Sequence, residues 1–380
     1  MPECEVSLIL PCRNEEATVG ECVKEAKGVF KSNGIKGEII VSDSGTDKSA
    51  YIAAQLGARV IAHNKMGYGA ACEEGARAAS GRILVFADAD GTYDLTEIPN
   101  LIKAVKSGAD LAVGYRVAGR IENKAMPLLN RYVGNPLLTS TLNVLFHSQV
   151  KDAHCGFRAL PTDVHKKLKL RTQGMEYASE MLVKASRLGL TIVNVPVGYR
   201  RRKGKSKLRP FPDGYRHLRL MLLFSPSQLL LLPGLLMFAV GFALLSAMLS
   251  GPHWLRVVTF DIHPIELGSL LTLLGYNIFL MGIYARKYAS AVGIDKPDPL
   301  VEEAAVYLTL ERGGLIGLIL FACGFAMNLN VLVEWFSSGF GELSEMRTVI
   351  FASTIMLLGV QTFFSAIFVS AMDEFRSDKD

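Results

Sequence analysis

The chain has 380 residues, of which 50% are hydrophobic and 20% are charged. Its mean hydropathy of +0.27 is high for a soluble protein, whereas the charged residues require a part that faces water, and the length is sufficient for two domains. The six cysteines are scattered without a Cys-x-x-Cys pair, which argues against a structural zinc site and favours free thiols in a reducing compartment.

Short apolar runs alternate with helical spacing in the first part of the chain. Strands are expected at Val6–Leu10, Glu38–Val41, Arg59–Ala62 and Ile83–Ala87, and helices at Ala17–Phe30, Ser49–Leu56 and Gly69–Ala79. This alternation predicts an α/β fold in which helices cover a mainly parallel sheet and ligands bind at the carboxyl ends of the strands. The first run is too short for the apolar region of a signal peptide.

Polar turns follow the first two expected strands. Pro11-Cys12-Arg13-Asn14-Glu15 could receive a nucleoside or cap a helix, and Asp43 repeats the arrangement after the second strand. Gly67-Tyr68-Gly69 approximates a dinucleotide fingerprint, but Cys72 replaces its third glycine. A nicotinamide dehydrogenase is therefore disfavoured.

Two aspartates one residue apart, Asp88 and Asp90, follow the fourth expected strand and precede Gly91. Alternate residues of an extended strand point the same way, so both carboxylates can face one point in space. Two hard oxygen ligands suit Mg²⁺ or Mn²⁺, which completes its shell with water and substrate phosphates. For this motif alone, a solvated acidic turn is the alternative.

Lys and Arg are concentrated before Ser225, most densely at Arg200, Arg201, Arg202, Lys203, Lys205, Lys207 and Arg209. Such a cluster could bind nucleic acid, anionic lipid or phosphate substrates. Because no aromatic-interleaved RNA motif accompanies it, nucleic acid is not expected as a partner.

Four apolar runs occupy the second part of the chain, at Leu229–Leu249, Ile265–Tyr284, Leu315–Leu332 and Val349–Met372. Each has roughly 18–24 residues, enough to cross a bilayer core of about 30 Å. Within them only Glu266 is charged, and the basic residues of the connecting segments predict that both termini are cytoplasmic. Before the first run, residues 213–226 predict an amphipathic helix, either on the cytoplasmic leaflet or packed on the soluble domain.

Six motifs in this order resemble family 2 glycosyltransferases, and more narrowly polyprenyl-phosphate (dolichyl-phosphate) glucosyl- and mannosyltransferases. They are Pro11-x-x-Asn14-Glu15, Asp43, Lys65-x-Gly67-x-Gly69, Asp88-Ala89-Asp90-Gly91, Asp152-x-x-x-Gly156-Phe157-Arg158 and Gly204-x-Ser206-Lys207. The resemblance covers about residues 5–228 in detail and the four apolar runs only as architecture. It implies a GT-A (Rossmann-like) catalytic domain at 1–208, an amphipathic juxtamembrane segment at 209–228 and a four-helix transmembrane domain at 229–380.

The resemblance assigns residues to the sugar donor. The nucleoside pocket would be lined by Pro11, Asn14, Glu15, Asp43, Lys65 and Asp88. Asp88 and Asp90 would hold Mg²⁺ or Mn²⁺ against the donor diphosphate, and Thr92 stands where relatives often have Gln, so a third protein ligand stays open. A basic loop would close over the donor phosphates with Arg201, Arg202, Lys205, Ser206 and Lys207. A charge cluster on anionic lipid is the competing explanation.

Three further residues are assigned to the acceptor. Arg116 and Arg131 match basic positions near the acceptor phosphate, and guanidinium groups suit phosphate because they donate paired hydrogen bonds and stay charged. Without the resemblance, Arg131 would be taken for a surface helix residue. Asp152 would act as a base or position the acceptor.

The resemblance implies inverting transfer of one hexose from a nucleotide-diphosphate sugar to polyprenyl or dolichyl phosphate at the cytoplasmic face of the cell membrane. UDP-glucose is favoured as the donor and GDP-mannose comes next. The expected partners are the nucleotide sugar, the lipid phosphate and the bilayer, and a homo-oligomer stays open. The alternatives are a processive polysaccharide synthase, whose Gln-x-x-Arg-Trp signature is absent, a carrier that flips lipid-linked sugar, and a non-catalytic binding module.

Overall fold

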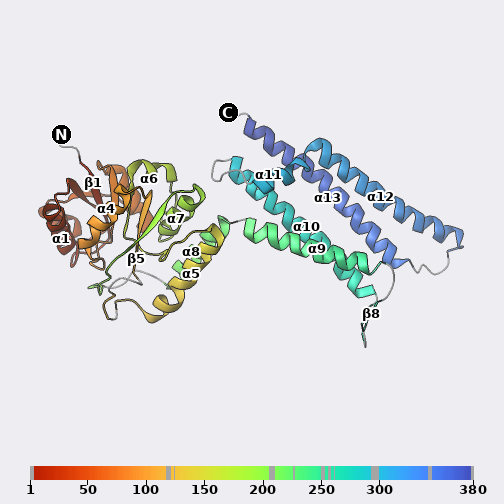
Figure 1. Cartoon of the computed structure of the whole chain (residues 1–380), viewed down its shortest axis with the longest axis horizontal. Coiled ribbons are helices and arrows are strands. Elements are labelled where there is room, and N and C mark those ends of the chain that lie inside the picture. The colour runs from red at the N-terminus through yellow and green to blue at the C-terminus, as the bar shows by residue number, and fades with distance from the viewer. Residues whose placement is uncertain are drawn as a thin grey trace. The chain divides into compact units, whose positions relative to one another are not determined.

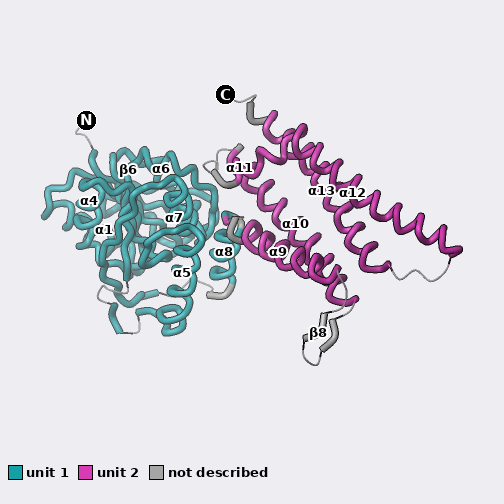
Figure 2. Tube along the Cα trace, turned by 45° about the vertical axis from the view of Figure 1, so that its right-hand side comes forward, with its two compact units in different colours: residues 1–224 teal, residues 225–380 magenta. Residues whose placement is uncertain are grey.

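The chain divides into two compact units, residues 1–224 and 225–380, which Figure 2 colours separately. The computed structural model describes residues 4–116, 121–123, 125–204, 210–225, 227–249, 253–255, 258–260, 262–291, 299–340 and 345–377. The division places the helix at 210–223, which we expected as a separate juxtamembrane segment, within the first unit.

A seven-stranded sheet of order β3-β2-β1-β4-β6-β5-β7 forms the centre of the first unit. Its strands are β1 (Val6–Cys12), β2 (Gly37–Asp43), β3 (Arg59–Ala62), β4 (Ile83–Phe86), β5 (Leu111–Tyr115), β6 (Arg158–Pro161) and β7 (Ile192–Pro196). All neighbouring strands run parallel except β6, which is antiparallel to both β4 and β5. The mainly parallel α/β sheet expected from the sequence is confirmed.

Helices cover both faces of this sheet (Figure 1). They are α1 (Val19–Ser32), α2 (Ser49–Gln55), α3 (Tyr68–Ala78), α4 (Ile98–Lys106), α5 (Asn135–Phe146), α6 (Thr162–Leu168), α7 (Tyr177–Arg187) and α8 (Pro210–Leu223), with short turns η1 (Leu95–Glu97) and η2 (Asn130–Gly134). Alternate strand residues face opposite sides, so Leu8 and Leu10 join the core with α1 and α4, and Ile9 joins the core with α3 and α7. Burial on both faces explains why the strands are continuous apolar runs.

Helix α8 packs on the first unit, against α5 and α7. Leu220 and Met221 are buried in the core that it shares with α7, while Tyr215 and Arg216 on its other side are exposed. Of the two placements left open by the sequence, these contacts support the one on the soluble domain. The exposed residues leave one side of the helix available to a membrane surface.

The second unit is helical apart from a short hairpin of β8 (His253–Leu255) and β9 (Val258–Phe260). Its helices are η3 (Ser227–Leu231), α9 (Leu232–Ala247), α10 (Ile262–Ala291), α11 (Pro299–Val306), α12 (Leu310–Ser337) and α13 (Met346–Ser377). Four stretches are long and apolar enough to cross a membrane, namely Leu229–Ala247, Ile262–Ser290, Leu310–Ser337 and Met346–Glu374. The four spans expected from the sequence are confirmed.

Glycines and hydroxyls join the four long helices. Gly317 of α12 lies so close to α13 that an added Cβ would come 2.6 Å from the Phe363 nitrogen. Between α10 and α13, hydrogen bonds of 2.6–2.7 Å link Ser269 to Thr354, Tyr276 to Thr362 and Tyr284 to Ser365. The series ends in an ion pair of 2.5 Å between Lys287 and Asp373, both just beyond the apolar runs that the sequence defined. Close backbone contact and interhelical hydrogen bonds are what hold helices together in lipid.

Candidate active site

The turns after β1 and β2 meet at one edge of the sheet, because these strands are parallel and Cys12 is in register with Asp43. Asn14 has a left-handed φ of 52°, which asparagine tolerates, and its Oδ1 accepts a 2.7 Å hydrogen bond from the Thr46 amide in the other turn. Oδ1 of Asp43 accepts a hydrogen bond from the amide of Gly45, which lies in the same turn. The predicted nucleoside residues of these two turns therefore lie together.

Asp88 and Asp90 lie at the same edge, in the turn after β4. Asp90 Oδ1 accepts hydrogen bonds from the amide and the hydroxyl of Thr92, at 3.0 and 2.6 Å, so this oxygen is fixed by its own turn. Asp90 Oδ2 lies 3.1 Å from Nη1 of Arg202. Among the described residues, Asp88 Oδ1 is buried without a hydrogen-bond partner. Asp88 thus has an unsatisfied oxygen, and Asp90 has an oxygen that faces a positive charge.

The electrostatics of this pair fit a bound cation. Burial and then the charge of Asp90 raise the pKa of Asp88 to about 7, although Arg116 and Arg202 act in the opposite direction. Two carboxylates that repel each other in a buried place are stabilised by a divalent cation, for which their oxygens are suitable ligands. In the described part of the chain, no group of three or more His, Cys, Asp and Glu side chains could hold a metal ion. The remaining ligands would come from water and the donor.

Arg116 and Asp152 form a buried, two-pronged ion pair. Arg116 directly follows β5. Its Nε and Nη2 donate hydrogen bonds to the two carboxylate oxygens of Asp152, at 2.7 and 3.0 Å. The ring of Tyr199 lies 5.1 Å from the guanidinium carbon. Although burial acts to raise it, the pKa of Asp152 is lowered by the charge and hydrogen bonds of Arg116. Asp152 is therefore a fixed anion that orients Arg116.

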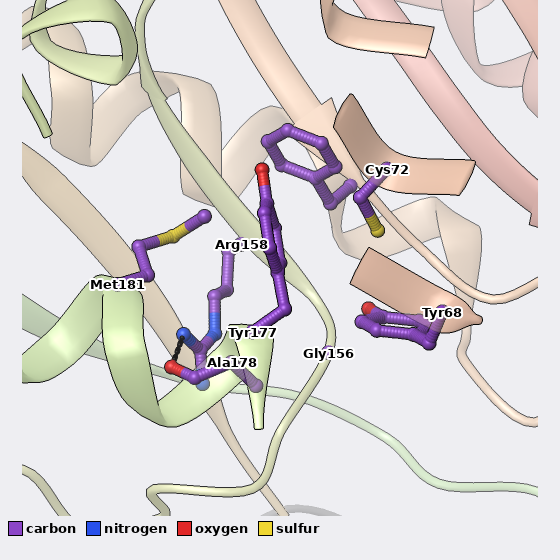
Figure 3. A pocket seen from close by; sticks show the side chains of 8 residues that line it. Tyr68, Cys72, Gly156, Arg158, Tyr177, Ala178 and Met181 are labelled. Atoms are coloured by element: carbon purple, nitrogen blue, oxygen red, sulfur yellow. Dashed lines mark hydrogen bonds between the residues drawn. The ribbon is translucent and has the colours of Figure 1, made fainter. Parts of the chain in front are cut away.

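Arg158, the first residue of β6, fixes the loop that carries Asp152. The buried guanidinium donates to the carbonyls of Ala153 and Cys155, both at 2.8 Å, and to that of Ala178 in α7, as Figure 3 shows. The sequence motif contained Arg158 but gave it no role. A charged residue at the start of an apolar strand was the signal for a buried structural cation.

Gly156 lets the same loop approach the aspartate pair. An added Cβ would lie 2.8 Å from the Tyr68 hydroxyl and 3.2 Å from Asp88 Oδ1. The Gly156 amide donates to the hydroxyl of Tyr93, at 2.7 Å. Figure 3 shows Gly156 beside Tyr68 at the small cavity that Arg158 also lines. The Asp152 loop and the Asp88 turn are therefore neighbours, although the sequence separates them.

Residues 199–204 run along the acidic turn. The Arg200 amide donates to the Thr92 carbonyl at 2.7 Å, and its guanidinium pairs with Glu25 and Asp94. Arg202 bridges Glu15 at 2.5 Å and Asp90 at 3.1 Å. Two residues of the predicted phosphate loop are therefore located. Arg202 contacts Asp90 of the aspartate pair, and Arg201 is exposed. Lys205, Ser206 and Lys207 lie outside the described residues.

Two predicted site residues have other surroundings. Lys65 is half exposed and pairs with Glu74 of α3 at 2.5 Å. Arg131 lies in η2, where its guanidinium carbon is 5.4 Å from the ring of Tyr132. The contacts of the described residues do not join either side chain to Asp88 or Asp152, so their proposed roles rest on the resemblance alone.

The fold and the site define a membrane-bound glycosyltransferase with a GT-A catalytic unit. Residues 7–169 match glycosyl transferase family 2, and residues 283–373 match the glycosyltransferase family 2 C-terminal transmembrane region. The low-salt glycan biosynthesis hexosyltransferase Agl6 of Haloferax volcanii is 35% identical over 370 residues, which cover 97% of this chain and 89% of that protein. The chain belongs to glycosyltransferase family 2.

Two further similarities cover the catalytic unit. A dolichyl-phosphate hexose transferase of Haloferax volcanii is 29% identical over 210 residues, which are 55% of this chain and 89% of that protein. Glucosyl-3-phosphoglycerate synthase from Mycobacterium tuberculosis, crystallised with Mn²⁺, UDP and glucosyl-3-phosphoglycerate, is 22% identical, with 58% of this chain and 80% of that chain covered. Its TM-score of 0.46 is too low to support a conclusion about the site.

Proposed function

We propose that this glycosyltransferase transfers a single hexose from a nucleotide-diphosphate sugar to polyprenyl or dolichyl phosphate. The observation that carries the proposal is the meeting of the Asp88–Asp90 pair with the Arg116–Asp152 pair, in a chain that also has four candidate membrane spans. The name of the dolichyl-phosphate hexose transferase that matches the first unit supports a lipid phosphate acceptor. UDP-glucose is the favoured donor and GDP-mannose comes next.

Asp88 and Asp90 would hold Mg²⁺ or Mn²⁺. When bound, the cation would neutralise negative charge on the leaving diphosphate. Pro11, Asn14, Glu15 and Asp43 would contact the nucleoside from the neighbouring turns, with Lys65 near the base or ribose. Arg202 already lies beside Asp90, so it would reach the same diphosphate.

Arg116 would orient the acceptor phosphate, with Arg131 as a second contact. Asp152 holds the Arg116 guanidinium in one direction through two hydrogen bonds. Placement of the acceptor oxygen in line with the anomeric carbon is the kind of orientation that can contribute about 7–11 kcal/mol. A phosphate acceptor is already anionic near neutral pH, so Asp152 serves as the positioning group rather than as a strong base. A single direct displacement would invert the configuration at the anomeric carbon.

The membrane unit would bring the enzyme to its acceptor. A polyprenyl tail stays in the bilayer, because each CH₂ that leaves it costs about 0.8 kcal/mol. An anchoring role for the four helices is supported by their apolar runs, in which Glu266 is the only charged residue, since a carrier would need charged residues along its path. The basic residues of the connecting segments support, by the positive-inside rule, a cytoplasmic location of the catalytic unit and of both termini.

The test is sugar transfer by the full chain in liposomes that contain polyprenyl phosphate. Radiolabelled UDP-glucose or GDP-mannose should label the lipid only when Mn²⁺ or Mg²⁺ is present, and the product should carry one hexose. Asp90→Asn should lower turnover on the order of 10²- to 10³-fold, as loss of transition-state charge stabilisation does, whereas the exposed Asp163→Asn should not. Label without cation, or full activity of Asp90→Asn, would contradict the proposal, and a ladder of longer products would indicate a processive synthase.

A further inference from the structure

Arg202 holds two carboxylates of the candidate active site at once. Its Nη2 lies 2.5 Å from Glu15 Oε1 and its Nη1 lies 3.1 Å from Asp90 Oδ2. The side chain is only 19% exposed. The two contacts come from different nitrogens, so the guanidinium spans the space between the turns after β1 and β4.

The contact involves the one Asp90 oxygen that its own turn leaves open. Thr92 engages Oδ1 through both its amide and its hydroxyl. Oδ2 is therefore the oxygen that a divalent cation would use, and it is the oxygen that Arg202 contacts. A guanidinium and a divalent cation cannot both lie against it without strong repulsion.

The backbone around Arg202 is anchored independently of this contact. On one side, Arg200 bonds to Thr92 through its amide and to Glu25 and Asp94 through its side chain. Next to it, the Arg201 amide donates to the Glu122 carboxylate at 2.8 Å. Arg202 can therefore leave Asp90 by a change of its own side-chain rotamers, while the segment remains in place.

We propose that Arg202 is a built-in substitute for the divalent cation. In the cation-free chain its guanidinium pairs with both Asp90 and Glu15. It leaves Asp90 when Mg²⁺ or Mn²⁺ binds, and it then donates to the donor diphosphate. This inference rests on the proposed function, because it assumes the cation site at Asp88 and Asp90.

The exchange has a thermodynamic consequence. The cation alone must break the Arg202–Asp90 contact, which weakens its binding, whereas the diphosphate gives Arg202 a new partner. Cation and nucleotide diphosphate should therefore bind with positive coupling, and by linkage each should raise the affinity of the other by the same factor. Without Arg202, the cation should bind better alone and this coupling should shrink.

The experiment measures Mn²⁺ binding to the full chain in lipid nanodiscs by electron paramagnetic resonance, with and without UDP. Arg202→Gln should bind Mn²⁺ alone roughly tenfold more tightly than the wild type, which corresponds to about 1.4 kcal/mol, and should gain less affinity when UDP is added. Lys203→Gln is the matched control, because it removes the same charge from the next residue, which pairs with the exposed Glu21. It should leave both quantities within about twofold.

A second measurement on the wild type reports the position of the side chain directly. Phenylglyoxal modification, mapped by mass spectrometry, should increase at Arg202 when Mn²⁺ alone is added, with the exposed Arg201 as the internal reference. Unchanged Mn²⁺ affinity in Arg202→Gln, or unchanged modification of Arg202, would overturn the exchange while the function stands, provided that Asp90→Asn loses Mn²⁺ binding. Undiminished Mn²⁺ binding by Asp90→Asn would instead overturn the cation site and with it the proposed function.

Discussion

At the scale of single residues, burial decides what the charged groups of the site can do. Arg116 and Asp152 are almost fully buried, and each satisfies the other through two hydrogen bonds. A buried charge that loses its partner cannot be solvated by water. Removal of one member therefore destabilises the fold by more than the intact pair stabilises it. The pair that we propose for the orientation of the acceptor is therefore also needed for the fold around it.

Asp152→Ala should lower the free energy of unfolding of the first unit by about 3–5 kcal/mol, because it leaves Arg116 buried without a counter-charge. Asp152→Asn keeps an oxygen acceptor and should be less destabilising, yet it should also reduce sugar transfer. Thermal unfolding and turnover are the measurements, with the exposed Asp163→Ala as the control. Equal stability of Asp152→Ala and the wild type would show that the pair carries no such constraint.

The partly buried His154 and the buried His217 connect the Asp152 loop to α8. The rings of His154 and His217 are 4.4 Å apart, and Nδ1 of His217 lies 2.8 Å from the Ser179 hydroxyl. Burial lowers the pKa of His217 to about 4, with Arg158 acting in the same direction and Asp213 in the opposite one. Burial, followed by the charge of His217, lowers the pKa of His154 to about 3. Both rings are therefore neutral in the folded chain near neutral pH.

The first unit should lose stability as the pH falls below about 6.5, because the unfolded chain then takes up protons that the folded chain refuses until about pH 4. For His217 alone the loss is about 2 kcal/mol at pH 5. His217→Asn should show a smaller drop in melting temperature between pH 7 and pH 5 than the wild type. His147→Asn, at an exposed residue of left-handed φ that asparagine tolerates, is the control and should titrate like the wild type. The same drop in His217→Asn would contradict the assignment.

At the scale of elements, residues 128–146, which include η2 and α5, present an apolar surface that the described residues of the first unit leave exposed. Its large side chains are each more than half exposed, namely Leu128, Leu129, Tyr132, Val133, Leu137 and Val144. The predicted acceptor contact Arg131 lies among them. Exposed apolar area of this extent favours contact with a membrane surface.

Leu137→Glu should reduce transfer to polyprenyl phosphate in liposomes about tenfold, since one large side chain contributes about 1.5–3 kcal/mol when it leaves water. UDP binding should not change. Leu188→Glu, another exposed leucine at the end of α7, is the matched control. Equal losses in the two variants would indicate that the surface of α5 has no special contact with the bilayer.

Helices α12 and α13 approach so closely that Gly317 has no room for a side chain. An added Cβ at Gly317 would lie 2.6 and 2.7 Å from backbone atoms of Phe363 and Gly359, whereas at Gly314 it would meet only the Phe363 ring, at 3.9 Å. Gly317→Ala should therefore destabilise the second unit by about 1–3 kcal/mol, as overpacking does, and Gly314→Ala should not. Thermal unfolding in detergent measures the difference, and equal melting temperatures of the two variants would argue against close packing at Gly317.

At the scale of the whole molecule, the chain consists of one α/β unit and one unit whose long helices are apolar enough to lie in a membrane. The first has its own sheet and two cores and includes α8, and the second is held by glycine contacts and by the hydrogen bonds between α10 and α13. Each unit therefore contains the interactions that stabilise it. We therefore expect the first unit to bind its donor without the second.

A chain that ends at Phe224 should keep α8 docked and should bind Mn²⁺ and UDP as the full chain does. Its transfer to polyprenyl phosphate in liposomes should fall at low acceptor density and recover as the acceptor density rises, because only the encounter with the membrane is impaired. Turnover as a function of acceptor density measures this. A truncated chain that cannot bind UDP would show that the second unit is needed for the catalytic fold.

The sequence by itself determined the features that depend on local pattern. Alternating short apolar runs defined the first four strands, four long apolar runs defined the spans, and the two-residue spacing of Asp88 and Asp90 indicated a shared direction. These signals are legible because strand and helix periodicities act over neighbouring residues. Motifs in order were enough to identify the family.

Tertiary structure decided which residues meet. Arg116 and Asp152 are 36 residues apart and Arg202 and Glu15 are 187 apart, and both pairs depend on an order of strands in which antiparallel β6 lies between β4 and β5. Neither β6 nor the hydrogen bonds of Arg158 to the carbonyls of Ala153 and Cys155 could be expected from the sequence. Local spacing carries no information about strand order or about the partner of a buried charge, since both are set by how the whole chain packs.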